Sequence, residues 1–485
     1  MFHVKHLSQK DDSMTLPSEK PSSLRAHWEN LPDDAQEIER VRAGFISAYG
    51  YEPEGVWSAP GRLNLLGEYI DFLGGTCLPM PLPYRTYIAG SARTDGVLRA
   101  ASAQMPADTR TAMIRDIVPG QLKGWFTYVA GVAWAMNQEG GRDIALPEHF
   151  GADLYINSRV PVGGGLSSSA ALEASTALAL LDLSCPQREN CAEIDRAAED
   201  RSAANDALRA RLAQVCINAE NTIAGAQTGG LDQSAALRSL PGQALAIDFR
   251  DFSIEPLHVA PEHDGLAWLV IDTNTPHELI DGGFAARRAA SESAASALGY
   301  SFLRQALPED LSFSGMSERE AKAIRANTVD SCTNAAMLAV ENAYGTPPAF
   351  PRGWVRHAFH DMMLVPRAIY VLKTLESTSN PAQRRELYRE LGHLLTESFV
   401  SMKDELRVSR VEIDETVRLC LEHGALGARI VGGGFGGAVM ALIPQDLLES
   451  TADAIARLYA SRGWAAPRFL PMCTGYAADI AYRRA

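Results

Sequence analysis

Residues 161–170 read Pro161-Val-Gly-Gly-Gly-Leu-Ser-Ser-Ser-Ala170, a glycine–serine loop that runs directly into an Ala/Leu-rich segment. Glycines allow a backbone to approach a ligand closely and to point several N–H groups at it. The pattern of the following residues predicts a helix that starts near Ser168, with the serines capping its first turn. A helix start offers unpaired N–H donors and a positive dipole end, so the loop is a candidate phosphate site. The alternative is a plain turn before a capped helix.

Two well-known phosphate-binding patterns are absent from this sequence. It contains no Gly-Lys pair, which excludes the loop GxxxxGK[ST], and it lacks the HRD and DFG motifs of protein kinases. Gly432-Gly-Gly-Phe-Gly-Gly437 does match GxGxxG, but the residues after it resemble a strand rather than a helix. We therefore expect a hairpin whose glycine turn packs against another loop, not a dinucleotide site.

An earlier loop concentrates polar groups in a tight turn. It reads Ala59-Pro-Gly-Arg-Leu-Asn-Leu-Leu-Gly-Glu-Tyr-Ile-Asp-Phe-Leu-Gly-Gly75. Glu68 and Asp71 are three residues apart and could accept hydrogen bonds from neighbouring sugar hydroxyls, while Arg62 could neutralise a phosphate. A surface turn with solvated charges is the alternative for this segment in isolation.

The rest of the chain mixes predicted helices and strands without a strict βαβ rhythm, which favours an α+β fold. We expect a flexible tail at residues 1–38, one domain at 39–240 and a second at 241–485. Insertions are expected near residues 185–216, as a polar surface helix, and near 301–351, as an irregular segment. His357 and His360 are three apart on a predicted helix, where packing or surface roles are favoured over a metal pair.

Composition limits the classes of partner. The chain has 485 residues with a net charge of -14, and an acidic surface argues against nucleic acid or an anionic membrane as partner. Seven scattered cysteines without a CxxC pair suit reduced thiols. No apolar run is long enough to span a membrane, and no signal peptide is indicated. We expect a cytoplasmic protein, a monomer or weak homodimer.

Taken together and in this order, the three glycine-rich segments resemble the signature motifs of the GHMP kinase superfamily. The first loop is similar to the galactokinase signature GRxNLxGExxDxxGG. The resemblance extends from about residue 41 to the C-terminal region. Further matching stretches are Ala219-Glu220, Gly229-Gly-Leu-Asp-Gln233, Arg287-Arg288 and Leu406-Arg-Val-Ser409.

The resemblance implies a two-lobed fold with the active site between the lobes, and transfer of phosphate from ATP to a sugar with Mg²⁺ as cofactor. By position, Asp232 matches the catalytic aspartate and Arg62 the arginine beside it. The matches to the magnesium ligands are Ser169 and Glu220. The matches to the nucleotide phosphate loop are Gly163, Gly164, Gly165, Leu166, Ser167, Ser168 and Ser169. The matches to the sugar contacts are Glu68, Tyr69, Asp71, Gly229 and Phe284.

Two of these positions depart from the family pattern. Tyr69 stands where galactokinases commonly have histidine, and Phe284 stands where a tyrosine usually precedes the Arg-Arg pair. Losing a polar partner can shift selectivity strongly. The expected activity is therefore a sugar 1-kinase, with galactose as first choice and galactose 1-phosphate as its product in the Leloir route. Kinases for N-acetylgalactosamine, galacturonate or arabinose, a non-catalytic sugar and ATP sensor, and a non-sugar GHMP kinase remain as alternatives.

Overall fold

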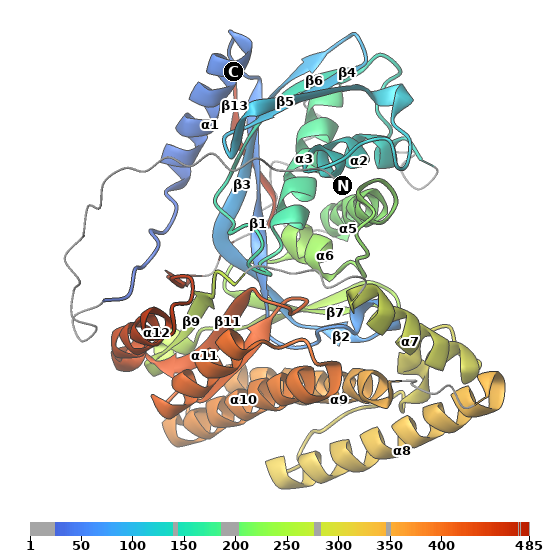
Figure 1. Cartoon of the computed structure of the whole chain (residues 1–485), viewed down its shortest axis with the longest axis vertical. Helices are drawn as coiled ribbons and strands as arrows, with labels where there is room; N and C mark the ends of the chain where they lie inside the picture. The colour runs from blue at the N-terminus through green and yellow to red at the C-terminus, as the bar shows by residue number, and fades with distance from the viewer. Residues whose placement is uncertain are drawn as a thin grey trace, which may run out of the picture.

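The fold combines helices with mainly antiparallel sheets in two lobes (Figure 1). The computed structural model describes residues 25–138, 144–185, 203–275, 283–345, 351–473, 475 and 477–484. The described strands form sheets of six, four and three strands. The predicted α+β class is confirmed. None of the described helices is both long and apolar enough to cross a membrane.

The N-terminal lobe consists of the six-stranded sheet and the helices on its two faces. In sheet order its strands are β13 (Asp479–Arg483), β1 (Gly55–Asn64), β3 (Pro79–Arg93), β6 (Gly151–Ser158), β4 (Val97–Ser102) and β5 (Met105–Met113). Its helices are α1 (Asp34–Tyr49), α2 (Phe126–Met136), α3 (Ser168–Ser184), α5 (Ala203–Ala219) and α6 (Leu231–Arg238). Helix α1 lies on one face and the other four lie on the opposite face (Figure 1). Every residue of β1 is buried between them.

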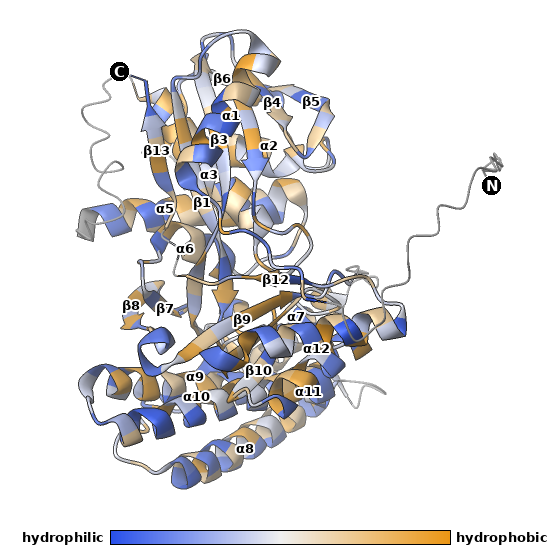
Figure 2. Cartoon of the chain, turned by 90° about the vertical axis from the view of Figure 1, so that its left-hand side faces the viewer, coloured by the Kyte–Doolittle hydropathy of each residue, from blue (hydrophilic) through white to orange (hydrophobic). Residues whose placement is uncertain are grey.

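The C-terminal lobe consists of the four-stranded sheet and six helices among the described residues. In sheet order its strands are β10 (Gly427–Val431), β11 (Ala438–Pro444), β9 (Leu266–Asp272) and β12 (Arg468–Leu470). Its helices are α7 (Gly283–Ala297), α8 (Glu318–Tyr344), α9 (Arg352–Ser377), α10 (Pro381–Ser401), α11 (Val411–Glu422) and α12 (Leu448–Arg462). Figure 2 shows hydrophilic residues along α8 and hydrophobic residues gathered in β9, as expected for an outer helix and a buried strand.

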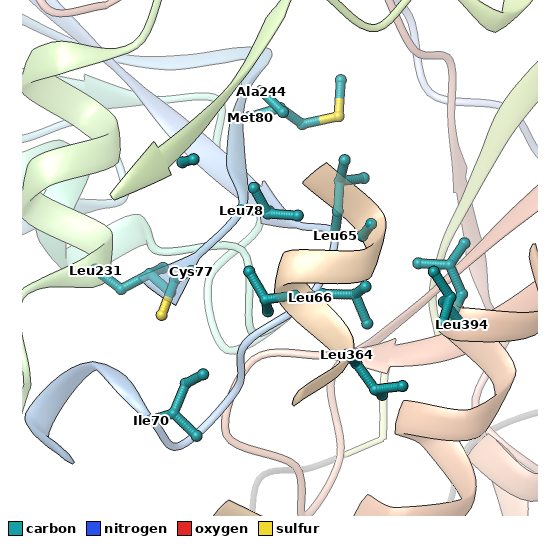
Figure 3. Packing of buried hydrophobic residues seen from close by; sticks show 14 of the residues in the cluster. Leu65, Leu66, Ile70, Cys77, Leu78, Met80, Leu231, Ala244, Leu364 and Leu394 are labelled. Atoms are coloured by element: carbon teal, nitrogen blue, oxygen red, sulfur yellow. The ribbon is translucent and has the colours of Figure 1, made fainter. Parts of the chain in front are cut away.

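The small sheet lies between the lobes and helps to bury the loop that follows β1. Its strands are β2 (Thr76–Cys77), β7 (Gln243–Asp248) and β8 (Ser253–His258). Figure 3 shows Leu65 and Leu66 among side chains from both lobes, including Leu231 of α6 and Leu364 of α9. Leu65 and Leu66 are fully buried. This apolar anchor fixes the loop, so the polar residues that follow it occupy defined positions.

The C-terminal strand does not belong with the second predicted domain. β13 pairs with β1 of the N-terminal lobe, so the expected range 241–485 is wrong for its last residues. Two buried arginines of the N-terminal lobe bind the segment just before β13. Arg85 donates to the carbonyl of Ala477, and Arg209 donates to that of Ala478. The division near residue 240 otherwise stays a prediction.

The predicted tail also needs correction. Residues 1–24 lie outside the described part, but residues 25–29 run along the edge strand β12. The Glu29 amide donates to the Phe469 carbonyl at 2.8 Å, and the Trp28 ring lies 5.6 Å from the Phe469 ring. The Ala26 amide and the Arg25 guanidinium both bond to Asp453 of α12. Because α1 then packs on the N-terminal lobe, this segment straps one lobe to the other.

Both expected insertions contain more structure than their sequences suggested. Residues 186–202 and 346–350 are outside the described part. Helix α5 nevertheless packs against α2 and α3, with Leu212 and Cys216 buried, so it is a core helix rather than a surface one. Helix α8 occupies most of 301–351 and starts with a capping box in which Ser317 and Glu320 satisfy each other's backbone amides. That Ser-x-x-Glu signal was present in the sequence.

Replacing Trp28 with alanine should destabilise the protein, because it removes the half-buried ring that holds the strap on Phe469. We expect Tm to fall by about 2–4 °C, measured by differential scanning calorimetry. His27→Ala is the matched control, since its exposed side chain leaves the backbone pairing intact. An unchanged Tm for Trp28→Ala would mean that the strap contributes nothing to stability.

Candidate functional site

The three glycine-rich segments meet in space. The Arg62 amide donates to the Leu166 carbonyl at 3.1 Å, and its guanidinium donates to the Gly165 carbonyl at 2.6 Å. On the other side, a Cβ placed on Gly432 would lie only 2.7 Å from the Gly165 carbonyl oxygen. Only glycine permits this approach. Residues 432–437 form the turn between β10 and β11, which confirms the predicted hairpin packed against another loop.

The phosphate-loop candidate opens α3 at Ser168, as predicted, but its first serine behaves differently. Ser167 adopts a left-handed conformation with φ 64°, and its side chain does not cap the helix. Its hydroxyl instead donates to Asp232 at 2.6 Å. The predicted capping by Ser167 is therefore wrong, because a carboxylate from α6 competes for the hydroxyl. The uncapped first turn keeps N–H donors that an anion can use.

Asp232 and Arg62 form an ion pair at the mouth of this loop. Asp232 lies in the first turn of α6, and its Oδ1 is 2.7 Å from Nη2 of Arg62. The Asp232 side chain is 26% exposed, whereas that of Arg62 is 6% exposed. Since Ser167 occupies the other carboxylate oxygen, Asp232 is held from both sides and remains reachable from solvent. The structure thus brings the predicted catalytic pair and the predicted phosphate loop together.

A group of buried carboxylates lies behind Ser169. Glu220 begins a π-helical turn, Glu220–Ala224, that continues α5, and its carboxylate lies beside the Ser169 hydroxyl. Burial and the charge of Asp232 raise the pKa of Glu220 to about 7. Gln233 donates to Glu220 and to Glu173, whose pKa is raised well above its ordinary value by burial and by Glu220. Neither Glu173 nor Gln233 was given a role from the sequence, although Glu173 is a charged residue within the predicted Ala/Leu-rich helix.

The donor set of this group suits a hard cation. One oxygen of Glu173 is buried without a hydrogen-bond partner, and several carboxylates face one another. The hydroxyl and carboxylate oxygens are the ligand types that Mg²⁺ prefers. Among the described residues, no cluster of three or more His, Cys, Asp or Glu side chains has metal-site geometry. Ser169 and Glu220 could therefore supply only part of a coordination shell, as in sites completed by phosphates and water.

Asp71 and Gly229, two predicted sugar contacts, lie against each other beside Asp232. The Asp71 carboxylate accepts a hydrogen bond from the Leu231 amide at 3.2 Å, and a Cβ on Gly229 would lie 2.4 Å from the Asp71 carboxylate. Burial raises the pKa of Asp71 to about 6, and the neighbouring charge of Asp232 adds to the effect while the Leu231 amide opposes it. A side chain at Gly229 would displace Asp71, which explains the glycine.

The other predicted sugar contacts are engaged elsewhere. The Glu68 carboxylate accepts a hydrogen bond from the Gly432 amide at 2.9 Å, and the Tyr69 hydroxyl donates to the Gly433 carbonyl at 2.5 Å. The Tyr69 ring lies 4.9 Å from the Phe284 ring. The structure thus places Glu68, Tyr69 and Phe284 at the contact between the first loop and the glycine hairpin, and leaves Asp71 with Gly229 as a separate pair.

Buried side chains from the C-terminal lobe hold the backbone of the first loop. Arg429 of β10 donates to the Leu65 carbonyl at 2.8 Å, and Asp361 of α9 accepts from the Gly67 amide at 3.3 Å. Burial opposes the ionisation of Asp361, yet the nearby histidines and Arg429 outweigh it and lower its pKa to about 2. His357 is buried and lies within hydrogen-bond distance of the Glu68 carbonyl and the Ser401 hydroxyl, so both of its ring nitrogens have partners. The sequence signal for these contacts was the presence of Asp361 and His357 on an otherwise apolar helix face.

A cavity of about 260 Å³ opens beside the phosphate-loop candidate. Its lining includes Trp125, Tyr128, Leu172 and the two serines at the start of α3. A flat, mostly apolar group attached to a phosphate in the loop would enter it directly. A larger cavity of about 750 Å³ lies among α8, α9 and α10 and contains none of the predicted site residues.

Comparison with known proteins agrees with this geometry. The model of the galactokinase galactose-binding signature matches residues 43–92, and the models of the GHMP kinase N-terminal and C-terminal domains match residues 127–239 and 380–461. The chain is 34% identical to galactokinase from Streptomyces coelicolor over 87% of this chain and 93% of that protein. It is 32% identical to galactokinase from Bos taurus over 85% of this chain and 89% of that protein.

The solved structures extend the comparison to the fold. The crystal structure of Lactococcus lactis galactokinase complexed with galactose superposes with a TM-score of 0.69 at 22% sequence identity, covering 91% of this chain and 99% of that one. A crystal structure of mevalonate kinase superposes with a TM-score of 0.50 at 12% identity, over 88% of this chain and 99% of that one. The architecture is that of the GHMP kinases, and with full-length relatives above 30% identity the chain belongs to the galactokinase family of this superfamily.

Proposed function

We propose that this protein transfers the terminal phosphate of ATP to the anomeric hydroxyl of α-D-galactose, forming galactose 1-phosphate and ADP. The observation that carries the proposal is the Asp232 carboxylate, fixed by Arg62 and Ser167 at the mouth of the glycine–serine loop. Phosphoryl transfer needs a positioned hydroxyl beside a stabilised phosphate, and this arrangement supplies both.

In the proposed mechanism Asp232 accepts the proton of the sugar hydroxyl, or orients that hydroxyl, as its oxygen attacks the terminal phosphorus and ADP leaves. Its two oxygens are held by Arg62 and Ser167, so the carboxylate cannot rotate away from the reacting group. Arg62 also bonds to the Gly165 carbonyl, which fixes the guanidinium next to the loop where negative charge develops. Positioning and charge stabilisation together account for most of the catalytic effect expected in such enzymes.

The nucleotide is assigned to residues 163–169 and to the cavity beside them. The glycines and the uncapped start of α3 would bind the phosphates through backbone amides. The cavity lined by Trp125 and Tyr128 would receive the base, since aromatic rings suit a flat heterocycle. Ser169 and Glu220 would hold Mg²⁺, which when bound neutralises phosphate charge. A cation there would also relieve the repulsion between Glu220 and its neighbouring carboxylates.

The sugar is assigned to the space next to Asp71, Gly229 and Asp232. Asp71 offers a carboxylate acceptor for neighbouring hydroxyls, as galactose would require. Galacturonate would call for an added cation, and residues 68–75 contain no lysine or arginine. N-acetylgalactosamine and arabinose are the nearest alternatives, because the aromatic pair Tyr69–Phe284 changes one wall near the site.

Turnover should be highest with galactose in an ADP-release assay that also includes N-acetylgalactosamine, galacturonate, arabinose and glucose. Asp232→Asn should lower kcat by at least about a hundredfold, because it removes the proton-accepting group. Asp251→Asn, an exposed position away from the site, is the matched control. Equal turnover in Asp232→Asn would refute its role. Binding of galactose and ATP by calorimetry without any turnover would make the wild-type protein a sensor instead.

The KM for galactose should rise as the pH falls through about 6. Asp71 accepts hydrogen bonds as a carboxylate, and its pKa of about 6 means that it becomes protonated below that pH. Between pH 7.5 and 5.5 the ionised fraction falls about fourfold, so KM should rise about fourfold. The measurement uses saturating ATP and Mg²⁺, so that titration of Glu220 does not enter. Asp71→Asn should show a higher KM that no longer varies with pH, and a flat wild-type profile would contradict the assignment.

A further inference from the structure

Arg468 lies near the phosphate loop although its position, more than 290 residues later in the chain, gave no sequence signal. It begins β12 and pairs with Asp272, the last residue of β9. The Asp272 carboxylate in turn lies against the loop, 3.4 Å from where a Cβ of Gly164 would be. The Asp272 carboxylate therefore contacts both the Arg468 guanidinium and the loop backbone near Gly164.

The charges at this edge of the loop are unusual for a phosphate site. Asp272 is 2% exposed and its carboxylate faces a loop that contains no lysine or arginine. Without a positive partner, the Asp272 carboxylate would repel an incoming triphosphate. Arg468 neutralises this carboxylate, and within the described part of the chain its Nε has no hydrogen-bond partner. Its side chain is 36% exposed, so it has room to move toward a ligand.

We propose that Arg468 binds the polyphosphate of the nucleotide, acting together with Arg62 at this loop. Arg62 is committed to Asp232 and to the Gly165 carbonyl, so it serves the reacting end. Arg468 is available to the Gly164 side, where its guanidinium can bond to a phosphate oxygen while still neutralising Asp272. The inference rests on the proposed function for the identity of the nucleotide as ATP.

A double-mutant cycle separates this role from simple neutralisation of Asp272. Titration calorimetry would give Kd for MgADP and for a non-hydrolysable ATP analogue with wild type, Arg468→Ala, Asp272→Asn and the double variant. If Arg468 contacts phosphate, Arg468→Ala should weaken both ligands by about tenfold or more, and the same loss should persist in the Asp272→Asn background. If it only neutralises Asp272, the double variant should bind as tightly as Asp272→Asn, and the proposal fails.

Two further measurements complete the test. Adenosine, which lacks phosphates, should bind wild type and Arg468→Ala equally, and the KM for galactose should be unchanged. Arg384→Ala is the matched control, because Arg384 forms a similar half-buried pair with Asp264 far from the loop. A lower Tm for Arg468→Ala with unaltered nucleotide binding would show that the Arg468–Asp272 pair only stabilises the fold, and would overturn the proposal. Failure of the wild type to phosphorylate any sugar would reject the proposed function while leaving the nucleotide cycle interpretable.

Discussion

The guanidinium of Arg62 is the contact on which the site depends. It bonds to Asp232 on α6 and to the Gly165 carbonyl in the loop before α3, while its own strand β1 lies between β13 and β3 in the N-terminal sheet. One nearly buried side chain therefore fixes the relative positions of three segments that are distant in sequence. Because a guanidinium is planar and always charged, it can fix direction and charge together, which a lysine could not.

Around this contact the chain accepts unfavourable electrostatics. Burial and mutual repulsion raise the pKa of Asp71, Glu220 and Glu173, so the folded state holds these groups against their ordinary tendency to ionise. Such arrangements destabilise a fold and persist where a ligand compensates them. The apolar anchor of Leu65 and Leu66, shared between the lobes, supplies the rigidity that keeps these carboxylates in place.

The fold class and most of the candidate site residues could be predicted from local sequence patterns. The contacts between residues far apart in the sequence could not. The loop before Ser168 and the turn at residues 432–437 were predictable because glycine and helix-start signals are local. Other contacts join residues more than 290 positions apart. They are the pairing of β13 with β1 and the hydrogen bonds by which Arg429 and Asp361 hold the first loop. No periodicity encodes such a pairing, since each residue taken alone resembles a solvated charge.

Two departures from the family pattern, Tyr69 and Phe284, lie together as one aromatic wall beside the first loop. Tyr69 takes the place of a histidine but directs its hydroxyl to the Gly433 carbonyl, and Phe284 packs on its ring without a polar group. A sugar hydroxyl turned toward these rings would lose water and gain no partner. Asp232, Arg62 and the phosphate loop are held by contacts independent of this wall. If these two residues contact the sugar, as proposed, we expect selectivity among galactose-like sugars to change at Tyr69 and Phe284 while the phosphoryl-transfer geometry stays the same.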